Sequence, residues 1–343
     1  MDVENALNAS SKSPCAVKSR GTIPGMLLLL LCVVLLSLRL GSAQMSNLEF
    51  FCSLLHRPGY ETGSLILYGL RLPRSVAGVL AGAGLSVSGV LLQSVTGNAM
   101  AAPNLIGVNA GAGFAVVLLL FFFPTAAVYA LPPAAFLGAF LTTLAIVTLA
   151  GKLGASKITI ILAGLACTAI LNAGISFFSL LDTDLLDSYS YFSSGGLSGI
   201  RMEQLALPAL FILACLIWSL ALSRQIDLLC LGDSMAASLG VRVRSLRMAC
   251  LICASASAAA VVSFAGLLGF VGLIVPHIAR RLTGFRVLPL LLSSVLCGGT
   301  LVVLGDLLGR LLFAPSELPV GIVMAFLGAP FFLFLLLRRR TAL

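Results

Sequence analysis

Long apolar stretches joined by short polar connections make up most of the chain of 343 residues. A helix that crosses the hydrocarbon core of a membrane needs about 20 mostly apolar residues. The uncharged stretch 248–279 is too long for one such helix, and Gly266, Gly269 and Gly272 supply a bend that divides it in two. The pattern predicts an all-α polytopic membrane protein with ten spans, at residues 23–40, 72–95, 105–123, 126–150, 158–181, 205–223, 246–264, 267–281, 287–308 and 320–337.

Composition excludes a soluble enzyme. Hydrophobic residues make up 59% of the chain and charged residues 10%, and the mean hydropathy is +1.12. A soluble domain has about 25% charged residues, so this chain lacks the polar surface that a water-facing exterior requires. We divide it into a cytoplasmic N-terminal segment (1–22), one transmembrane domain (23–337) and a basic cytoplasmic tail (338–343).

The first apolar run has two interpretations. Lys12, Lys18 and Arg20 precede it, and Gly41-Ser42-Ala43 resembles the cleavage site of a secretory signal peptide. Arg39 stands just before that site and the polar lead is long, which favours a retained membrane helix. Both interpretations give the later spans the same orientation.

Basic residues orient the spans, because loops rich in Lys and Arg stay on the cytoplasmic side. With both termini inside, 15 of the 21 basic residues lie there. The six outside are Arg39, Arg57, Arg71, Arg74, Arg201 and Arg310. Arg71 and Arg74 share one helix face beside Pro73, where we expect the second span to begin. Because they oppose the orientation bias, they indicate an acidic partner outside. The basic residues form no continuous run, so nucleic acid is not an expected partner.

Features of other transporter classes are absent from the sequence. No charged residue lies near the middle of a predicted span, whereas ion-coupled carriers place an ionisable group there. The chain has no GxxxxGK[ST] phosphate-binding loop, since Leu153 follows its one Gly-Lys pair, Gly151-Lys152. Any ATP and magnesium that power transport must therefore bind a partner subunit.

The cysteines and histidines do not indicate a metal or catalytic site. Cys250 and Cys253 form a CxxC pair, but they lack the second pair or nearby histidine of a metal site. His277 follows Pro276 at the inner end of a span, and we interpret it as structural rather than as a haem ligand. We predict no catalytic residue, no metal site and no cofactor bound by this chain.

Small residues follow the outer arginines. The pairs Gly78-xxx-Gly82 and Gly84-xxx-Ser88 have the spacing that lets membrane helices approach closely. The connection that follows, 96–104, carries no charge, which is uncommon for an inner loop. This predicts backbone that folds back into the protein.

A second inner connection, 231–241, reads LGDSMAASLGV. Asp233 or Ser234 can cap a short helix, and the glycine near the end of the segment can terminate it. Ala237 and Leu239 supply a small apolar knob. An exposed knob of this kind favours contact with a partner protein, although a simple interfacial loop fits the sequence equally well.

Several motifs carry a resemblance to one family in combination. They are LRLPR at 70–74, LGDSMAASLGV at 231–241, GLLGFVGLIVPHIARR at 266–281, ELPVG at 317–321 and GAPFF at 328–332. Over about residues 65–337 the chain resembles the FecCD-like permeases, the membrane subunits of ABC importers for ferric siderophores, haem and cobalamin.

The resemblance implies a type II ABC importer permease fold of about ten helices per subunit, in a bacterial cytoplasmic membrane. It implies a second permease copy or a close paralogue, two ATP-binding subunits that hold ATP and magnesium, and a periplasmic or lipid-anchored substrate-binding protein. The chain would be a permease rather than an enzyme. Its expected cargo is a ferric siderophore, with haem or cobalamin as the alternative. An ion-coupled secondary carrier or a receptor without transport is the alternative of another class.

The resemblance also implies roles for individual residues. It assigns docking of the binding protein to Arg71, Arg74 and Arg310, coupling to the ATPase to Asp233, Ala237, Leu239, Gly240 and Val241, and the translocation path to Gly164, Asn172, Gly174 and Ser176. Asp306 stands four residues before Arg310, so we expect an ion pair between them on one helix face. Three departures from the family pattern weaken any inference about the cargo. They are Gly97-Asn98-Ala99-Met100-Ala101, Phe192, and the absence of the acidic-His pair that is common in the family before Arg286.

Overall fold

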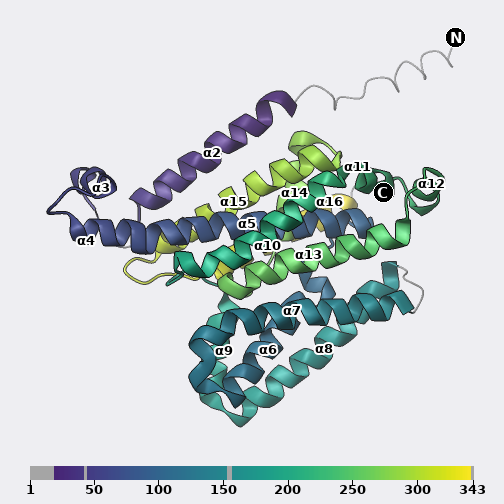
Figure 1. Ribbon diagram of the computed structural model, residues 1–343, viewed down its shortest axis with the longest axis horizontal. Coiled ribbons are helices and arrows are strands. Elements are labelled where there is room, and N and C mark those ends of the chain that lie inside the picture. The colour runs from purple at the N-terminus through teal and green to yellow at the C-terminus, as the bar shows by residue number, and fades with distance from the viewer. Residues whose placement is uncertain (1–18, 42–44, 153–156, 341–343) are drawn as a thin grey trace.

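The computed structural model describes residues 19–41, 45–152 and 157–340, and in these ranges every regular element is a helix (Figure 1). Seven of the spans they form are long and apolar enough to cross a membrane. These are built on α2 (Ser19–Arg39), α5 (Leu72–Thr96), α7 (Ala127–Lys152), α8 (Lys157–Leu181), α10 (Met202–Ala221), α13 (Val243–Ala265) and α15 (Val287–Leu312). The other helices are α3 (Asn47–Leu54), α4 (Glu61–Ser64), η1 (Leu65–Arg71), η2 (Pro103–Ile106), α6 (Val108–Phe122), η3 (Pro124–Ala126), α9 (Thr183–Ser194), α11 (Ser223–Cys230), α12 (Asp233–Ser238), α14 (Val271–Thr283) and α16 (Val320–Arg340).

Each of the ten predicted spans falls on a helix, which confirms the all-α polytopic fold. The eighth span, predicted at 267–281, needs a correction because α14 begins only at Val271. Its 13 residues rise about 20 Å, less than the hydrocarbon core of about 30 Å. The chain enters α14 through the non-helical residues 266–270, where Phe270 has a φ of +63°.

Helix α5 is the centre of the bundle. Of the most apolar 18-residue window in its span, 83% is buried, and it contacts α15, α13, α14 and α10 (Figure 1). A β-carbon at Gly82 would overlap the backbone of Gly298 in α15, and one at Gly89 would overlap the carbonyl of Gly272 in α14. The prediction that small residues here serve close helix packing is therefore confirmed.

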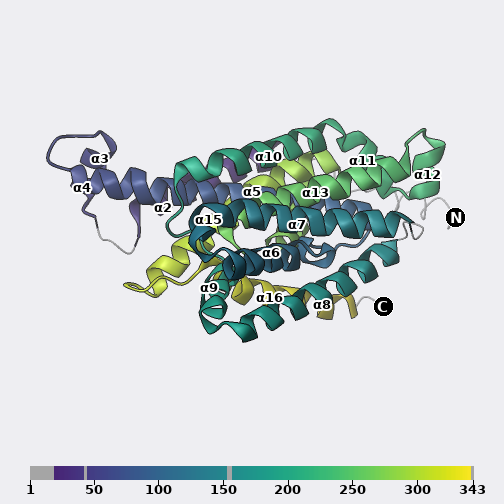
Figure 2. The ribbon, with the colours of Figure 1, turned by 60° about the horizontal axis from the view of Figure 1, so that its bottom comes forward.

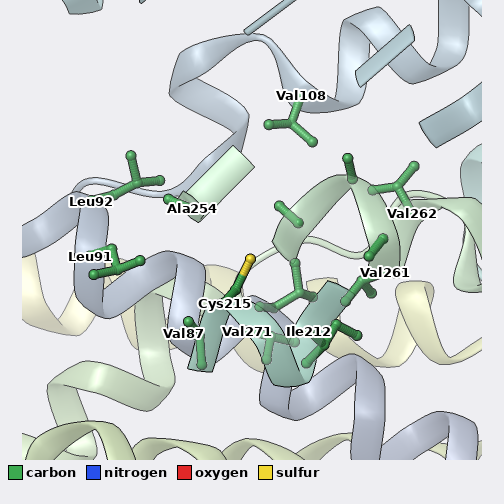
Figure 3. Close-up of a cluster of buried hydrophobic side chains, with 14 of the residues drawn as sticks. Val87, Leu91, Leu92, Val108, Ile212, Cys215, Ala254, Val261, Val262 and Val271 are labelled. Atoms are coloured by element: carbon green, nitrogen blue, oxygen red, sulfur yellow. The ribbon is translucent and has the colours of Figure 1, made fainter. Parts of the chain in front are cut away.

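Apolar side chains of α5, α10, α13 and α14 fill the space between these helices (Figure 3). Leu91 of α5, Ile212 of α10 and Val261 of α13 are among the fully buried members of this core. Lipid tails are as apolar as these side chains, so the stabilisation comes from close packing more than from removal of apolar surface from water.

The second span begins earlier than predicted. The elements α4, η1 and α5 form one continuous helix of 36 residues, Glu61–Thr96. Pro73 has no N–H to donate and would break regular α-helical bonding. The π-helical segment η1 directly precedes Pro73, and in it the N–H of Leu72 donates a hydrogen bond to the carbonyl of Leu67, five residues earlier. The helix therefore continues beyond Pro73 toward α3 and α4, at the left end of Figure 1.

The helical bundle has two ends. We call the end with α3 and α4 the outer end, and the opposite end, with α11 and α12, the inner end (Figures 1 and 2). Arg71 and Arg74 follow α4 in the same continuous helix. The start of α15 also lies at the inner end, because its Val287 N–H donates to the carboxylate of Asp227 at 2.7 Å. The predicted inner residues Lys12 and Lys18, and residues 341–343 of the tail, lie outside the described residues.

Candidate functional site

Two arginines surround one buried carboxylate at the outer end. Arg74 Nε lies 3.0 and 2.9 Å from the two carboxylate oxygens of Asp306, and Arg310 Nε lies 3.1 Å from Asp306 Oδ2. This confirms the predicted pair of Asp306 and Arg310. A second carboxylate, Glu317, lies 2.6 Å from Arg74 Nη1. Because the side chain of Asp306 is 3% exposed and both arginines contact it, loss of Asp306 would leave their charges without a shared buried counter-charge.

The same network holds the outer end of α2. Arg71 Nη1 donates hydrogen bonds to the carbonyls of Leu38 at 2.9 Å and Arg39 at 2.6 Å. Arg310 Nη2 donates to a serine hydroxyl of α2 at 2.7 Å. Cationic groups are favourable at the carbonyl end of a helix. Cleavage after α2 would therefore remove hydrogen-bond partners of the buried side chains of Arg71 and Arg310. Residues 42–44 of the predicted cleavage site lie outside the described residues.

The three arginines assigned to docking differ in access. Arg71 and Arg310 are 4% and 3% exposed, whereas the side chain of Arg74 is 11% exposed. Arg74 and Glu317 also line an outer hollow of about 150 Å³. The pair of Arg74 and Glu317 is therefore the part of the network that a partner outside can reach most directly, and the docking role of all three arginines stays a prediction.

Helix α12 presents the predicted apolar knob at the inner end. Met235 and Leu239 are 53% and 55% exposed, and Ala237 between them is exposed as well. Gly240, with a φ of +84°, follows the helix as predicted, and its N–H donates to the Ala237 carbonyl at 3.0 Å. Asp233 does not cap the helix, because the N-cap is the preceding glycine.

Two contacts fix α12 to its surroundings. The N–H of Val241 donates to the carbonyl of the fully buried Ala236 at 3.0 Å. The carboxylate of Asp233 accepts hydrogen bonds from Arg247 Nη2 at 2.6 and 2.8 Å. Arg247 belongs to α13 and is 7% exposed, so this pair ties the surface helix to a helix that runs through the bundle. Sequence analysis did not single out Arg247, since a separation of 14 residues across a loop follows no helical period.

The four residues assigned to the translocation path lie on two faces of α8. Asn172 and Ser176, about one helical turn apart, are exposed. Gly164 is buried, and a β-carbon at Gly174 would meet the ring of Phe114 in α6. Close packing against α6 therefore accounts for Gly174, and the path role of the four residues stays a prediction.

An open hollow of about 660 Å³ lies where α6, α9, α16 and the non-helical residues 266–270 come together. Asn109, Ser193 and Phe270 line it together with Phe326 of α16, which is 74% exposed. Figure 2 shows α8, α9 and α16 along one side of the bundle. We call the side formed by these helices the α8–α16 side.

The uncharged connection 96–104 folds back into the protein, which confirms the prediction. Ala101 is 3% exposed, and the side-chain amide of Gln93 donates to the carbonyls of Ala101 and Gly272, both at 3.3 Å. The side chain of Asn98 accepts the N–H of Met100 at 3.0 Å. Hydrogen bonds within the protein therefore hold this connection in place without any charged side chain.

The described residues contain no group of three His, Cys, Asp or Glu side chains that could hold a metal ion. His277 packs its ring edge-on against Phe331, with 5.9 Å between the ring centroids. Cys253 lies 3.8 Å from the hydroxyl of Ser219 inside the buried core. Both side chains thus contact other side chains of the protein.

Comparisons with known proteins identify relatives along nearly the whole chain. The sequence model of the FecCD transport family matches residues 28–338. The iron(3+)-hydroxamate import system permease protein FhuG of Bacillus subtilis is 37% identical, over 91% of this chain and 95% of that protein. The hemin transport system permease protein HmuU of Yersinia pestis is 34% identical, over 92% and 97%. A solved structure described as an inward-facing metal-chelate type ABC transporter matches with a TM-score of 0.81 and 29% identity, over 92% of this chain and 99% of that one.

Proposed function

Because the chain belongs to the FecCD transport family, we propose that it is the permease subunit of an ABC importer that takes up a ferric siderophore. It is a multi-pass protein of the inner membrane, and ATP hydrolysis in partner subunits drives the uptake. The observation that carries this proposal is the family match across residues 28–338. The similarity to an iron(3+)-hydroxamate permease supports the iron chelate as cargo.

Two ATP-binding subunits contact the inner end and hold the ATP and magnesium. The exposed knob of Ala237 and Leu239 on α12 supports this contact, because an apolar surface in water favours a partner protein. Asp233 and Arg247 carry displacement of α12 to α13, which packs against α5, α7 and α10. The permease needs only two packings of similar free energy, whose populations the partners shift.

A periplasmic or lipid-anchored binding protein delivers the cargo at the outer end. Arg74 is the arginine that meets it, because it lines the outer hollow. Glu317 Oε2 lies 2.6 Å from Arg74 Nη1. An acidic side chain of the binding protein therefore competes with Glu317 for the guanidinium of Arg74. Arg71 and Arg310 support this contact from inside, by holding α2 and Asp306.

A second permease copy, or a close paralogue, covers the α8–α16 side. Exposed apolar side chains on both helices support this, among them Phe177 at 59% and Phe326 at 74% exposure. The cargo then passes between the two copies, beside Asn172 and Ser176. The described residues offer no set of metal ligands, so recognition of the chelate falls mainly to the binding protein.

Uptake by intact cells tests the cargo. Cells that lack this gene, with and without complementation, are supplied in parallel with a labelled ferric hydroxamate siderophore, haem and cobalamin. We expect loss of siderophore uptake alone, restored by complementation. The haemin permease relative makes haem the specific alternative, and selective loss of haem or cobalamin uptake would reassign the cargo within the same architecture.

A further inference from the structure

Two hollows flank Arg242 at the inner end. One, of about 460 Å³, lies between the end of α10, helix α11 and the start of α13, and Trp218 and Gln225 are among the residues that line it. The other, of about 520 Å³, is lined by Arg244 and its neighbours in the first turns of α13. Both include Arg242 and Ser245. Together they form one groove around the start of α13, which we call the inner groove.

The inner groove is positively charged. Arg242 and Arg244 are exposed, and none of the described residues that line the groove is acidic. The start of α13 adds the partial positive charge of a helix N-terminus. The groove therefore attracts an anion.

Apolar side chains make up another part of the groove wall. Trp218 of α10, Leu222 at the C-terminal end of that helix and Ala249 of α13 line the same hollow. Next to Trp218, α10 exposes Leu213 at 50% and Ile217 at 66%, and such residues contact acyl chains in a membrane protein. Tryptophan prefers the level of the lipid headgroups. A ligand that matches both the basic and the apolar lining of the groove has an anionic group and an acyl chain.

We infer that the inner groove binds an anionic phospholipid of the inner leaflet. The lipid phosphate lies against Arg242 and the first turn of α13, and one acyl chain follows Trp218. Basic pockets between membrane helices on the cytoplasmic side are suited to anionic headgroups. Leu239 and Val241, which connect α12 to α13, line the same hollow. A bound lipid therefore holds the segment that contacts the ATPase, a role beyond the proposed transport function and independent of the cargo.

Trp218 is the single tryptophan of the chain, so its fluorescence reports directly from the proposed site. The full chain is reconstituted in phosphatidylcholine vesicles that contain increasing fractions of phosphatidylglycerol with brominated acyl chains, because bromine quenches a nearby indole. We expect saturable quenching by brominated phosphatidylglycerol at fractions where brominated phosphatidylcholine quenches little. Equal quenching by the two lipids would overturn the proposal. So would relief of the quenching by millimolar inorganic phosphate, which would indicate a site for a free anion.

Charge-removing variants locate the phosphate. Arg242→Gln should weaken the preference for phosphatidylglycerol about fivefold, the weight of one basic residue at an anionic membrane surface, and Arg244→Gln should act in the same direction. Arg201→Gln removes an exposed arginine near the outer end and should leave the quenching curve unchanged. All three residues are exposed, and elution volume and circular dichroism are used to check that each variant folds. A quenching curve of Arg242→Gln that coincides with that of the parent chain would contradict the assignment.

Discussion

Asp233 and Arg247 join the surface helix α12 to the membrane helix α13 through hydrogen bonds of 2.6 and 2.8 Å. The side chain of Asp233 is 53% exposed, whereas that of Arg247 is 9% exposed. The pair therefore reaches from the surface that faces the proposed ATPase into the interior of the bundle. A rigid link at this point is what a permease without its own nucleotide site needs in order to respond to ATP.

Removal of this link should uncouple ATP hydrolysis from transport. Arg247→Met should lower the amount of cargo transported per ATP hydrolysed by up to about fivefold, because it removes the hydrogen bonds that join Asp233 to α13, and a pair with one exposed partner contributes about 1 kcal/mol or less. Cargo uptake and phosphate release are measured together in proteoliposomes that contain the assembled importer. Arg281→Gln, which removes an exposed arginine of the inner end, is the control. An unchanged ratio in Arg247→Met would show that α12 acts by another route.

The two carboxylates of the outer network should differ in their contribution to stability. Asp306→Asn leaves Arg74 and Arg310 without their shared buried counter-charge and should lower the unfolding free energy by about 3–5 kcal/mol. Glu317, with 29% of its side chain exposed, should contribute about 1 kcal/mol or less when changed to Gln. Unfolding by titration with dodecyl sulfate compares the two variants. Equal losses would mean that burial does not govern this network.

Substitutions of Arg74 and Glu317 should change the affinity of the binding protein in opposite directions. Arg74→Gln should weaken docking several-fold and flatten its dependence on salt, since charged contacts at an interface act through long-range attraction. Glu317→Gln should strengthen docking, because it frees Arg74 Nη1 for an acidic partner. The dissociation constant is measured at low and moderate salt, with the exposed outer residue Arg57→Gln as control. Unaltered affinity in both variants would remove Arg74 from the docking surface.

Spans and short-range pairs could be predicted from the sequence, because lipid demands about 20 apolar residues per helix and residues four apart share a helix face. The ion pair of Asp306 and Arg310 was predicted from their spacing of four residues. The pairing of Arg74 with Asp306 could not be predicted in this way, because the two residues are 232 positions apart in the sequence and no helical spacing relates them. The start of α14 at Val271 could not be predicted either, because hydropathy does not reveal the left-handed conformation of Phe270.

The close approach of α5 and α15 predicts a different kind of defect. Gly82→Leu places a side chain where the backbone of Gly298 lies, so the helices must separate and lose packing along their contact. We expect a large loss of thermal stability, beyond the 1–3 kcal/mol typical of an overpacked core. Gly69→Ala is the control, because a β-carbon there meets no atom within 4 Å. Stability is followed by the fraction of protein that stays monodisperse after heating, and similar values for the two variants would contradict this packing.

The energy source of transport tests the central claim most directly. The chain is reconstituted in proteoliposomes with its ATP-binding subunit and binding protein, and accumulation of a labelled ferric hydroxamate siderophore is followed with and without ATP and a protonophore. The ABC permease assignment predicts accumulation that requires ATP and the ATP-binding subunit and is insensitive to the protonophore. Accumulation by the permease alone, abolished by the protonophore, would contradict it and identify an ion-coupled carrier.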